Sequence, residues 1–226
     1  MMVWTSARKK GEIALEPLPR TFYDRDTLSV ARALLGQLLV RTLDDGTRLA
    51  CQITETEAYI GRTDKACHAY GYRRTPRTET LFARPGTAYL YLIYGIYHCL
   101  NCITEPEGEP AGVLIRGAVP VEGEDIIAKN RFDRKMEELT SAQRKNLLNG
   151  PGKLCQGLAL TRAQNGLDLT GAAGCLFVCP GPSPAPEEIR VGKRIGIDYA
   201  QEAVDFPWRF WYEPSFRKGG RGRVLF

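Results

Sequence analysis

Residues 54–59 read Thr54-Glu55-Thr56-Glu57-Ala58-Tyr59 and end a β-prone run that begins at Leu49. Side chains two residues apart on a strand point to the same side. Glu55 and Glu57 are therefore expected to share one face of the strand, with Tyr59 beside them. Two neighbouring carboxylates on one face are the first candidate site in the chain.

This run is predicted to be the return strand of a β-hairpin. Residues 37–42 alternate weakly and are β-prone, and Asp44-Asp45-Gly46-Thr47 between the two runs is a turn signal. The two carboxylates would then lie at the end of the hairpin that is far from its turn.

A second β-prone run, residues 88–104, contains four tyrosines in nine residues around the turn Tyr94-Gly95. Aromatic side chains provide flat surfaces on which bases stack and wedges that separate base steps. By themselves, however, tyrosines at strand spacing are as well explained by core packing, and an exposed turn tyrosine by contacts with its own hairpin.

The other expected elements are short strands and a few helices. Capping residues at 24–27 predict a helix that ends before Gly36, and a long basic loop occupies 60–84. Further helices are expected at 123–137 and 150–160, and further strands at 113–118, 174–179, 188–196 and 208–211. This pattern predicts one α+β domain at 21–216, with a curved, mainly antiparallel sheet flanked by helices. Residues 1–20 are expected to be a poorly ordered lead-in and 217–226 a basic, flexible tail.

Composition excludes several classes of protein. The 226 residues are 43% hydrophobic and 25% charged, which is typical of a globular domain. No apolar run approaches the ~20 residues of a membrane helix, and the first residues lack a secretory signal, so we expect a cytoplasmic protein, associated with the nucleoid if bacterial. The net charge of +5 is concentrated at 62–84 and in the tail after Arg209. Such clusters suit a polyanionic partner, although a solvated basic surface explains them equally well.

The seven cysteines are odd in number and scattered, which argues against a disulfide framework. Cys99-x-x-Cys102 and Cys175-x-x-x-Cys179 have spacings that could suggest zinc. Cys99 and Cys102, however, lie in an apolar run that is predicted to be a strand, where their odd spacing places the two thiols on opposite faces. We therefore expect reduced, mostly buried cysteines, no metal and no cofactor.

Several motifs in order resemble the alkyladenine (3-methyladenine) DNA glycosylases of the mammalian type, over residues of about 20 to 212. They are Glu-Thr-Glu-Ala-Tyr at 55–59, His68, Pro85-Gly86-Thr87, the run 91–97, Asn101 and Leu114-Ile115-Arg116. The resemblance implies a fold like that of the C-terminal domain of tRNA formyltransferases. It also implies a monomeric enzyme that flips damaged purines out of double-stranded DNA and hydrolyses the N-glycosidic bond. The purines would be 3-methyladenine, 7-methylguanine, hypoxanthine or ethenoadenine.

The resemblance assigns the candidate site residues. Glu57 would be the general base that deprotonates a water, and Arg116 would orient that water. Without the resemblance, Glu57 is as well explained as a solvated carboxylate on a strand, and Arg116 as one half of a structural salt bridge. The residues implied to hold the base are Tyr59 on one side, His68 and Tyr91 on the other, Asn101 as a group that disfavours guanine, and Leu114.

The remaining implied contacts are with the duplex. Tyr94 would fill the gap left by the flipped nucleotide, and Ile96 would enter the minor groove. Ile96 departs from the family pattern, which has methionine there, and Glu79 departs from a basic or neutral stretch. The resemblance places Arg73, Thr75 and Arg77 near the DNA backbone. Arg131 is a further candidate for a DNA contact.

Two other functions remain open. One is a non-catalytic nucleic-acid-binding module of the same fold, which would have no use for the pair Glu57 and Arg116. The other is a hydrolase of free nucleosides, which would need neither the basic loop nor Tyr94. No lysine is placed as a nucleophile in these motifs, so an enzyme of this kind would use water and leave the DNA strand intact.

Overall fold

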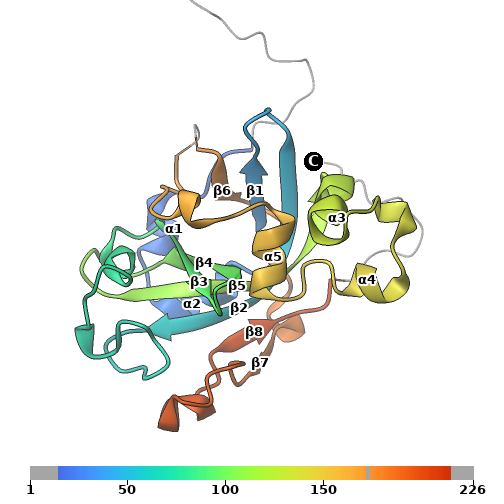
Figure 1. The fold of residues 1–226 in the computed structure, drawn as a ribbon. Helices are drawn as coiled ribbons and strands as arrows, with labels where there is room; N and C mark the ends of the chain where they lie inside the picture. Colours follow the sequence, from blue (N-terminus) through green and yellow to red (C-terminus); the bar gives the residue numbers. More distant parts are fainter. Residues whose placement is uncertain (1–14, 172–173, 215–226) are drawn as a thin grey trace, which may run out of the picture.

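The computed structural model describes residues 15–171 and 174–214, which form an antiparallel sheet with helices on both faces (Figure 1). The predicted α+β fold with a mainly antiparallel sheet is confirmed. Six of the eight described strands follow the order β3-β4-β5-β2-β1-β6; off this path, β8 pairs with β2 and β7 pairs with β8. The strands are β1 Leu38–Thr42, β2 Arg48–Ile60, β3 Ala88–Ile93, β4 Tyr97–Ile103, β5 Ala111–Glu122, β6 Leu176–Cys179, β7 Arg190–Gly192 and β8 Arg209–Trp211.

Strand β2 is the centre of the sheet, because it pairs along its length with β5 and divides its other edge between β1 and β8. Thr56 points into the core, where its hydroxyl donates a 2.8 Å hydrogen bond to the Ala31 carbonyl. Glu55 and Glu57 both contact Arg116 on the opposite face. The prediction that the two carboxylates share a face is confirmed.

The pairing of β2 with β5 contains two consecutive irregularities. Ile53 faces Ala118 and Glu55 faces Gly117, so that Thr54 is an extra residue on β2. Thr56 then faces Ile115, which leaves Arg116 as an extra residue on β5. Bulges bend a strand and redirect its side chains. The bulge on β5 directs the side chain of Arg116 at the two carboxylates.

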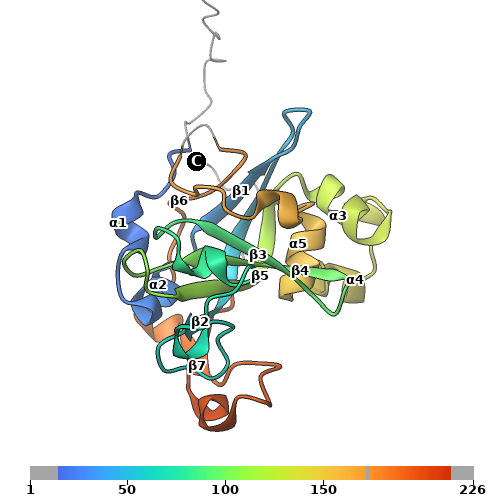
Figure 2. The same ribbon diagram turned by 60° about the vertical axis from the view of Figure 1, so that its left-hand side comes forward.

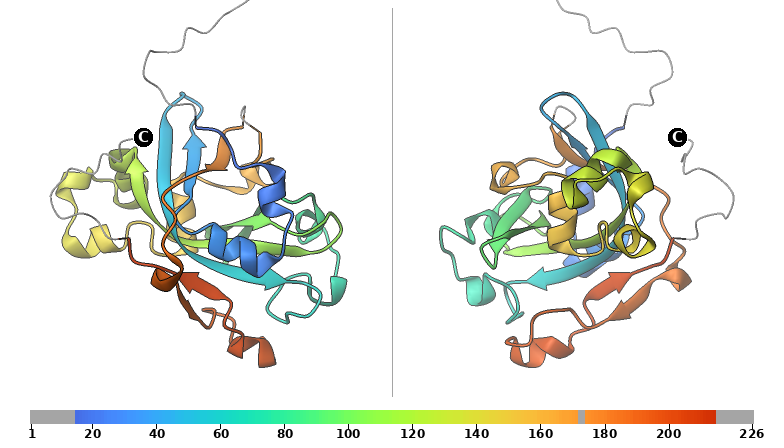
Figure 3. Two further views of the ribbon diagram at one scale, coloured as in Figure 1. Left: turned by 180° about the vertical axis from the view of Figure 1, so that it is seen from behind. Right: turned by 45° about the vertical axis from the view of Figure 1, so that its right-hand side comes forward.

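Helices cover both faces of the sheet. They are α1 Arg20–Tyr23, α2 Thr27–Ala33, α3 Glu124–Phe132, α4 Ser141–Lys145 and α5 Pro151–Gly157. Asp26 caps helix α2, because its carboxylate accepts a hydrogen bond from the Ser29 amide. The helix packs with α1 behind β2 and β5 (Figure 3). Helices α3 and α5 pack together on the other side, where α5 contacts β4 and β5. Short 3₁₀ turns lie at Tyr70–Tyr72, Glu79–Phe82, Met136–Glu138, Arg162–Gln164, Pro186–Glu188 and Gln201–Asp205.

The β3–β4 hairpin runs across the molecule toward α5 (Figure 2). Its strands pair in register from Ala88 with Cys102 to Ile93 with Tyr97. Gly152 in α5 lies so close to Tyr97 that a β-carbon would be 2.9 Å from the ring. The hairpin and α5 therefore form one continuous rim beside the sheet.

Several expected elements differ in extent. The helix expected at 123–137 ends at Phe132, because Asp133 takes a left-handed φ of +54°, and 136–138 is a separate turn. The helix expected at 150–160 ends at Gly157. The strand expected at 188–196 extends only over Arg190–Gly192.

The described part of the expected N-terminal lead-in packs against the fold. Leu18 belongs to the expected lead-in, yet it is buried and its amide donates a 2.7 Å hydrogen bond to the Val178 carbonyl. The rest of the lead-in up to residue 14, and the tail expected at 217–226, lie outside the described residues. Within the described ranges, no helix has the length and apolar character needed to cross a membrane.

Candidate active site

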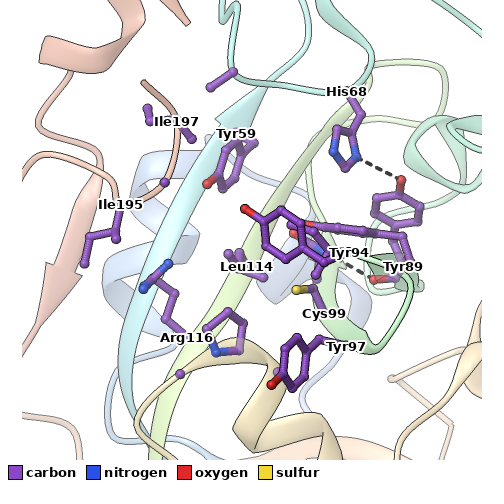
Figure 4. Close-up of a pocket in the computed structure, with 18 of the residues that line it drawn as sticks. Tyr59, His68, Tyr89, Tyr94, Tyr97, Cys99, Leu114, Arg116, Ile195 and Ile197 are labelled. Atoms are coloured by element: carbon purple, nitrogen blue, oxygen red, sulfur yellow. Dashed lines mark hydrogen bonds between the residues drawn. The ribbon is translucent and has the colours of Figure 1, made fainter. Parts of the chain in front are cut away.

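A cavity of about 960 Å³ opens beside β2, β4 and β5 and contains most of the predicted site residues. Figure 4 shows Tyr59, His68 and Tyr94 around the same space, with Arg116 and Leu114 beside it. The side chains that line it are mainly aromatic and apolar, which suits a flat heterocycle. The predicted residues on its walls are Tyr59, His68, Tyr91, Tyr94, Asn101, Leu114, Arg116 and Arg131.

Glu57 lies directly behind this wall, with a side chain that is 0% exposed. Its Oε2 accepts a 2.8 Å hydrogen bond from the Tyr59 hydroxyl, and its Oε1 accepts one of 2.8 Å from the Ile195 amide. Nη1 of Arg116 is 3.5 Å from Oε2. All three partners line the cavity. The carboxylate is thus held by three donors that also line the cavity.

Burial dominates the electrostatics of this carboxylate. Loss of water raises the pKa of Glu57 above its ordinary value, and nearby Glu55 raises it further. The positive charge of Arg116 and the hydrogen bonds from Ile195 and Tyr59 lower the pKa and offset part of this shift. A buried acid with a raised pKa is a group suited to proton transfer near neutral pH.

Arg116 is held by Glu55 more closely than by Glu57. Its Nε donates a 3.2 Å hydrogen bond to Oε1 of Glu55, and the same oxygen accepts one of 2.9 Å from Nη1 of Arg209. Gly117 faces Glu55 across the sheet, where a β-carbon would be 3.2 Å from that of Glu55. Glu55 therefore fixes the position of Arg116, while Arg209, which the sequence analysis did not select, fixes Glu55.

The aromatic groups opposite Tyr59 form a compact cluster. The rings of His68 and Tyr91 meet edge to face at 4.6 Å, and Tyr89 lies 5.3 Å from Tyr91. Nδ1 of His68 and the Tyr89 hydroxyl are 3.2 Å apart (Figure 4). Burial, aided by the charge of Arg77, lowers the pKa of His68 to about 4. His68 is therefore a neutral ring at physiological pH.

Asn101 and Leu114 face each other across β4 and β5 and line the cavity. Asn101 is buried, and its Nδ2 donates a 3.3 Å hydrogen bond to the Tyr89 carbonyl. This bond fixes the amide beneath the aromatic cluster. The predicted disfavouring of guanine by Asn101 stays a prediction.

The tip of the β3–β4 hairpin presents two exposed apolar side chains. Tyr94 is 81% exposed and Ile96 is 69% exposed. Tyr94 and Gly95 both have left-handed backbones, with φ of +53° and +73°, as in a type I′ turn. This conformation is costly for tyrosine, and it points a large ring into solvent at the mouth of the cavity.

The residues predicted to lie near the DNA backbone differ in their exposure and in their partners within the fold. Arg73 and Arg77 are exposed, and the Arg77 guanidinium lies 5.7 Å from the centre of the Tyr91 ring. Thr75 is tied into its own turn by hydrogen bonds with Thr78. Glu79, the acidic departure, pairs with Arg74 at 2.6 Å.

Arg131 lies at the α5 side of the cavity, where its guanidinium is engaged within the fold. Its Nε donates a 2.8 Å hydrogen bond to the Leu147 carbonyl, Nη2 contacts Asn146, and Nη1 contacts Gln156. A role of Arg131 in contacting DNA stays a prediction.

The structure adds one segment to the site that sequence reasoning missed. Residues 195–199 line the cavity, and Ile195 contributes its backbone amide rather than its side chain. Tyr199 is 66% exposed there, and its hydroxyl donates a 3.2 Å hydrogen bond to the Ala66 carbonyl. A backbone amide that donates a hydrogen bond leaves no signature in the sequence. The aromatic residue Tyr199, in contrast, could have indicated that this segment belongs to the site.

The cysteines behave as the sequence predicted. All seven are free, and six are buried. Cys99 lines the cavity whereas Cys102 belongs to the main core, so the two thiols lie on opposite faces of β4. In the part of the chain that the structure describes, no three histidine, cysteine, aspartate or glutamate residues gather as a metal site.

Comparisons with known proteins indicate one family. The family model described as methylpurine-DNA glycosylase (MPG) matches residues 21–215. Relatives that carry the name "Putative 3-methyladenine DNA glycosylase" cover most of the chain. One from Clostridium perfringens strain SM101 is 50% identical over 198 residues, which are 88% of this chain and 96% of the relative. One from Desulfitobacterium hafniense strain Y51 is 46% identical over 201 residues, 89% of this chain and 97% of the relative. One from Bacillus cereus strain B4264 is 50% identical over 197 residues, 86% of this chain and 95% of the relative.

Proposed function

The chain belongs to the methylpurine-DNA glycosylase family and is a DNA glycosylase, and we propose that it removes alkylated and deaminated purines, with 3-methyladenine and hypoxanthine as representatives, from duplex DNA by base flipping. The product is an abasic site in an uncut strand.

The cavity supports the flipping step. A purine turned out of the helix stacks between Tyr59 and the pair of His68 and Tyr91, since flipped bases are held by aromatic faces and a few hydrogen bonds. Tyr94, on the exposed tip of the hairpin, occupies the space that the nucleotide leaves. Unpairing costs least at damaged or mismatched bases, which favours lesions over normal purines.

The buried Glu57 carboxylate is the observation that carries the proposal. A water beside Arg116 attacks C1′ of the flipped nucleotide and forms the new C–O bond, while the bond between C1′ and the purine nitrogen breaks and its electrons leave with the base. Glu57 takes the proton of that water. Its negative charge also stabilises the oxocarbenium character of the sugar, as carboxylates do in glycoside hydrolysis.

The two other functions explain less of the site. A nucleic-acid-binding module gains nothing from a carboxylate held in a cavity where burial opposes its charge. A hydrolase of free nucleosides leaves the exposed pair Tyr94 and Ile96 without a role.

Alkali-revealed cleavage of a labelled duplex with one hypoxanthine tests the proposal. The wild type should produce abasic sites that break only after alkali, and Glu57→Gln should lose about 10²- to 10⁴-fold in single-turnover rate, which is the usual contribution of a general base. Binding of the lesion duplex should be retained. Duplexes with 3-methyladenine and ethenoadenine define the range of bases.

Cleavage by Glu57→Gln at the wild-type rate would show that another group activates the water. Equal binding of damaged and undamaged duplex, without cleavage of any of the three lesions, would favour the binding module instead.

A further inference from the structure

Arg194 is a buried cation directly behind the candidate site. Its side chain is 0% exposed, and both of its terminal nitrogens contact the carboxylate of Asp64, which is equally buried. Nη1 also donates a 2.8 Å hydrogen bond to the Ala58 carbonyl, and Nη2 donates one of 3.2 Å to the Ala203 carbonyl. One guanidinium thus joins β2, the loop after it and the turn before β8.

The same guanidinium lies over two aromatic rings. It lies 4.7 Å from the centre of the Tyr59 ring and 5.1 Å from that of Trp208. Cations are attracted to such ring faces. Arg194 therefore supports Tyr59, the residue whose hydroxyl donates to Oε2 of Glu57.

The next residue in the chain supplies the other donor. The Ile195 amide donates to Oε1 of Glu57. Ile195 is itself 50% exposed, and Gly196 follows with a left-handed φ of +76°. The buried Arg194 immediately before Ile195 and the buried Ile197 two residues after it anchor this segment.

We propose that Arg194 is a positioning residue for the Glu57 carboxylate, which it orients through the Tyr59 ring on one oxygen and the Ile195 amide on the other. The inference rests on the proposed function of Glu57 as general base. Because Arg194 is paired with Asp64, it supports the Glu57 carboxylate without placing another unpaired charge beside the flipped base.

A purely structural role explains the ion pair less well. A buried ion pair is often no more stabilising than apolar side chains of the same volume, because both charges lose their water. What the charged pair supplies is a fixed geometry: a planar donor with directed bonds to two backbone carbonyls that lie next to the site.

The charged and titratable groups that face Glu57 come from several strands. Besides the Ile195 amide they are Glu55 and Tyr59 of β2, Arg116 of β5, Cys99 of β4 and, through Glu55, Arg209 of β8. Replacement of Arg194 leaves all of these in the chain. Its effect on Glu57 must therefore pass through Tyr59 and Ile195.

The decisive measurement is the titration of Glu57 in the free protein, by carbon NMR of labelled glutamate carboxyls, with Glu57→Gln to assign the signal. The variant is Arg194→Met combined with Asp64→Asn, which removes both buried charges and keeps an acceptor for the Ala66 amide. The midpoint of Glu57 should move up by about one pH unit, the effect expected when a hydrogen bond to a charged group is lost.

Activity provides the second readout. The single-turnover rate on the hypoxanthine duplex should fall about 10- to 100-fold, since small misplacements of a reacting group have effects of this size, and this loss should exceed the loss of affinity for the duplex. Arg194→Lys, which keeps a charge for Asp64 but cannot reach both carbonyls, should lie in between. Leu39→Ala in the core of β1 is the control, because it lowers the melting temperature away from the cavity and should leave the Glu57 midpoint in place.

An unchanged Glu57 midpoint in the folded double variant would overturn the inference. So would a shift of the same size in Leu39→Ala. The titration needs no substrate, so it decides the role of Arg194 even if the wild type releases none of the three bases, a result that would count against the proposed function alone.

Discussion

The Tyr59 hydroxyl donates a 2.8 Å hydrogen bond to Oε2 of Glu57, two residues earlier on the same strand. The wall of the cavity and the acid behind it therefore form one hydrogen-bonded unit. Under the proposed function, a base that stacks on Tyr59 contacts the partner of the proposed general base directly, so binding and the alignment of Glu57 are coupled within three residues of β2.

The first prediction concerns the pH dependence of base release. Glu57 must be ionised to accept a proton, and burial raises its pKa above the ordinary glutamate value. The single-turnover rate on a hypoxanthine duplex should fall with decreasing pH, with a midpoint above 4.5, the ordinary value for glutamate. Residual activity of Glu57→Gln should lack this decline, and a decline shared by both proteins would assign it to another group.

The second prediction concerns stability. Since the pKa of Glu57 is higher in the folded than in the unfolded state, its ionisation favours unfolding as pH rises through the folded-state pKa. Glu57→Gln should therefore melt at a higher temperature than the wild type at pH 8, and the difference should shrink toward pH 4. Glu187→Gln, an exposed control, should not show this pattern. Equal melting curves at pH 8 would contradict a burial cost at Glu57.

The third prediction is that His68 stays neutral throughout the physiological range. The chain has two histidines, so proton NMR resolves His68 beside His98 as an internal reference. The midpoint of His68 should be about 4. Arg77→Gln should raise it only in part, because burial is the larger cause and the charge of Arg77 the smaller. A wild-type midpoint near 6.5 would mean that the ring is solvated.

The fourth prediction separates strain from function at the hairpin tip. Tyr94→Asn places a residue that tolerates the left-handed conformation beside Gly95, and should leave stability unchanged or raise it by about 1 kcal/mol. Capture of a lesion duplex, measured by fluorescence of a base analogue, should nevertheless weaken. Tyr72→Asn makes the same exchange at another left-handed tyrosine and should not affect capture. Full capture by Tyr94→Asn would exclude the wedge.

The fifth prediction concerns the partner of Arg116. Glu55→Gln removes the charge that both Arg116 and Arg209 contact, at 3.2 and 2.9 Å. Arg116 should then move toward Glu57 and occupy the place of the attacking water. A loss of about 10- to 100-fold in single-turnover rate is expected, with lesion binding retained. A wild-type rate would show that Glu55 only stabilises the sheet.

The sequence predicted the parts of the fold that rest on local patterns. Alternation along β2 placed Glu55 and Glu57 on one face, and Tyr94-Gly95 marked the turn of the aromatic hairpin. The extent of other elements depends on tertiary contacts that no local pattern contains. Residues 193–196 look like strand, for example, yet they leave the sheet where Arg194 turns inward to Asp64.

The same limit applies to the site. Residue types and a family resemblance identified the side chains around the cavity. The bulge that redirects Arg116 and the amide of Ile195 depend on backbone geometry, and the ion pair of Glu55 with Arg209 joins positions far apart in the chain. Such contacts follow only from the folded coordinates.

The division of one edge of β2 between β1 and β8 has a consequence for synthesis of the protein. The hairpin tip and the basic loop are complete before the ribosome reaches residue 110, whereas the strand that covers Glu57 and the amide that holds it come from beyond residue 190. A chain that ends before residue 190 contains the hairpin tip and the basic loop but lacks two of the contacts that surround Glu57. Under the proposed mechanism, glycosidic bond cleavage therefore needs the segments beyond residue 190 in place.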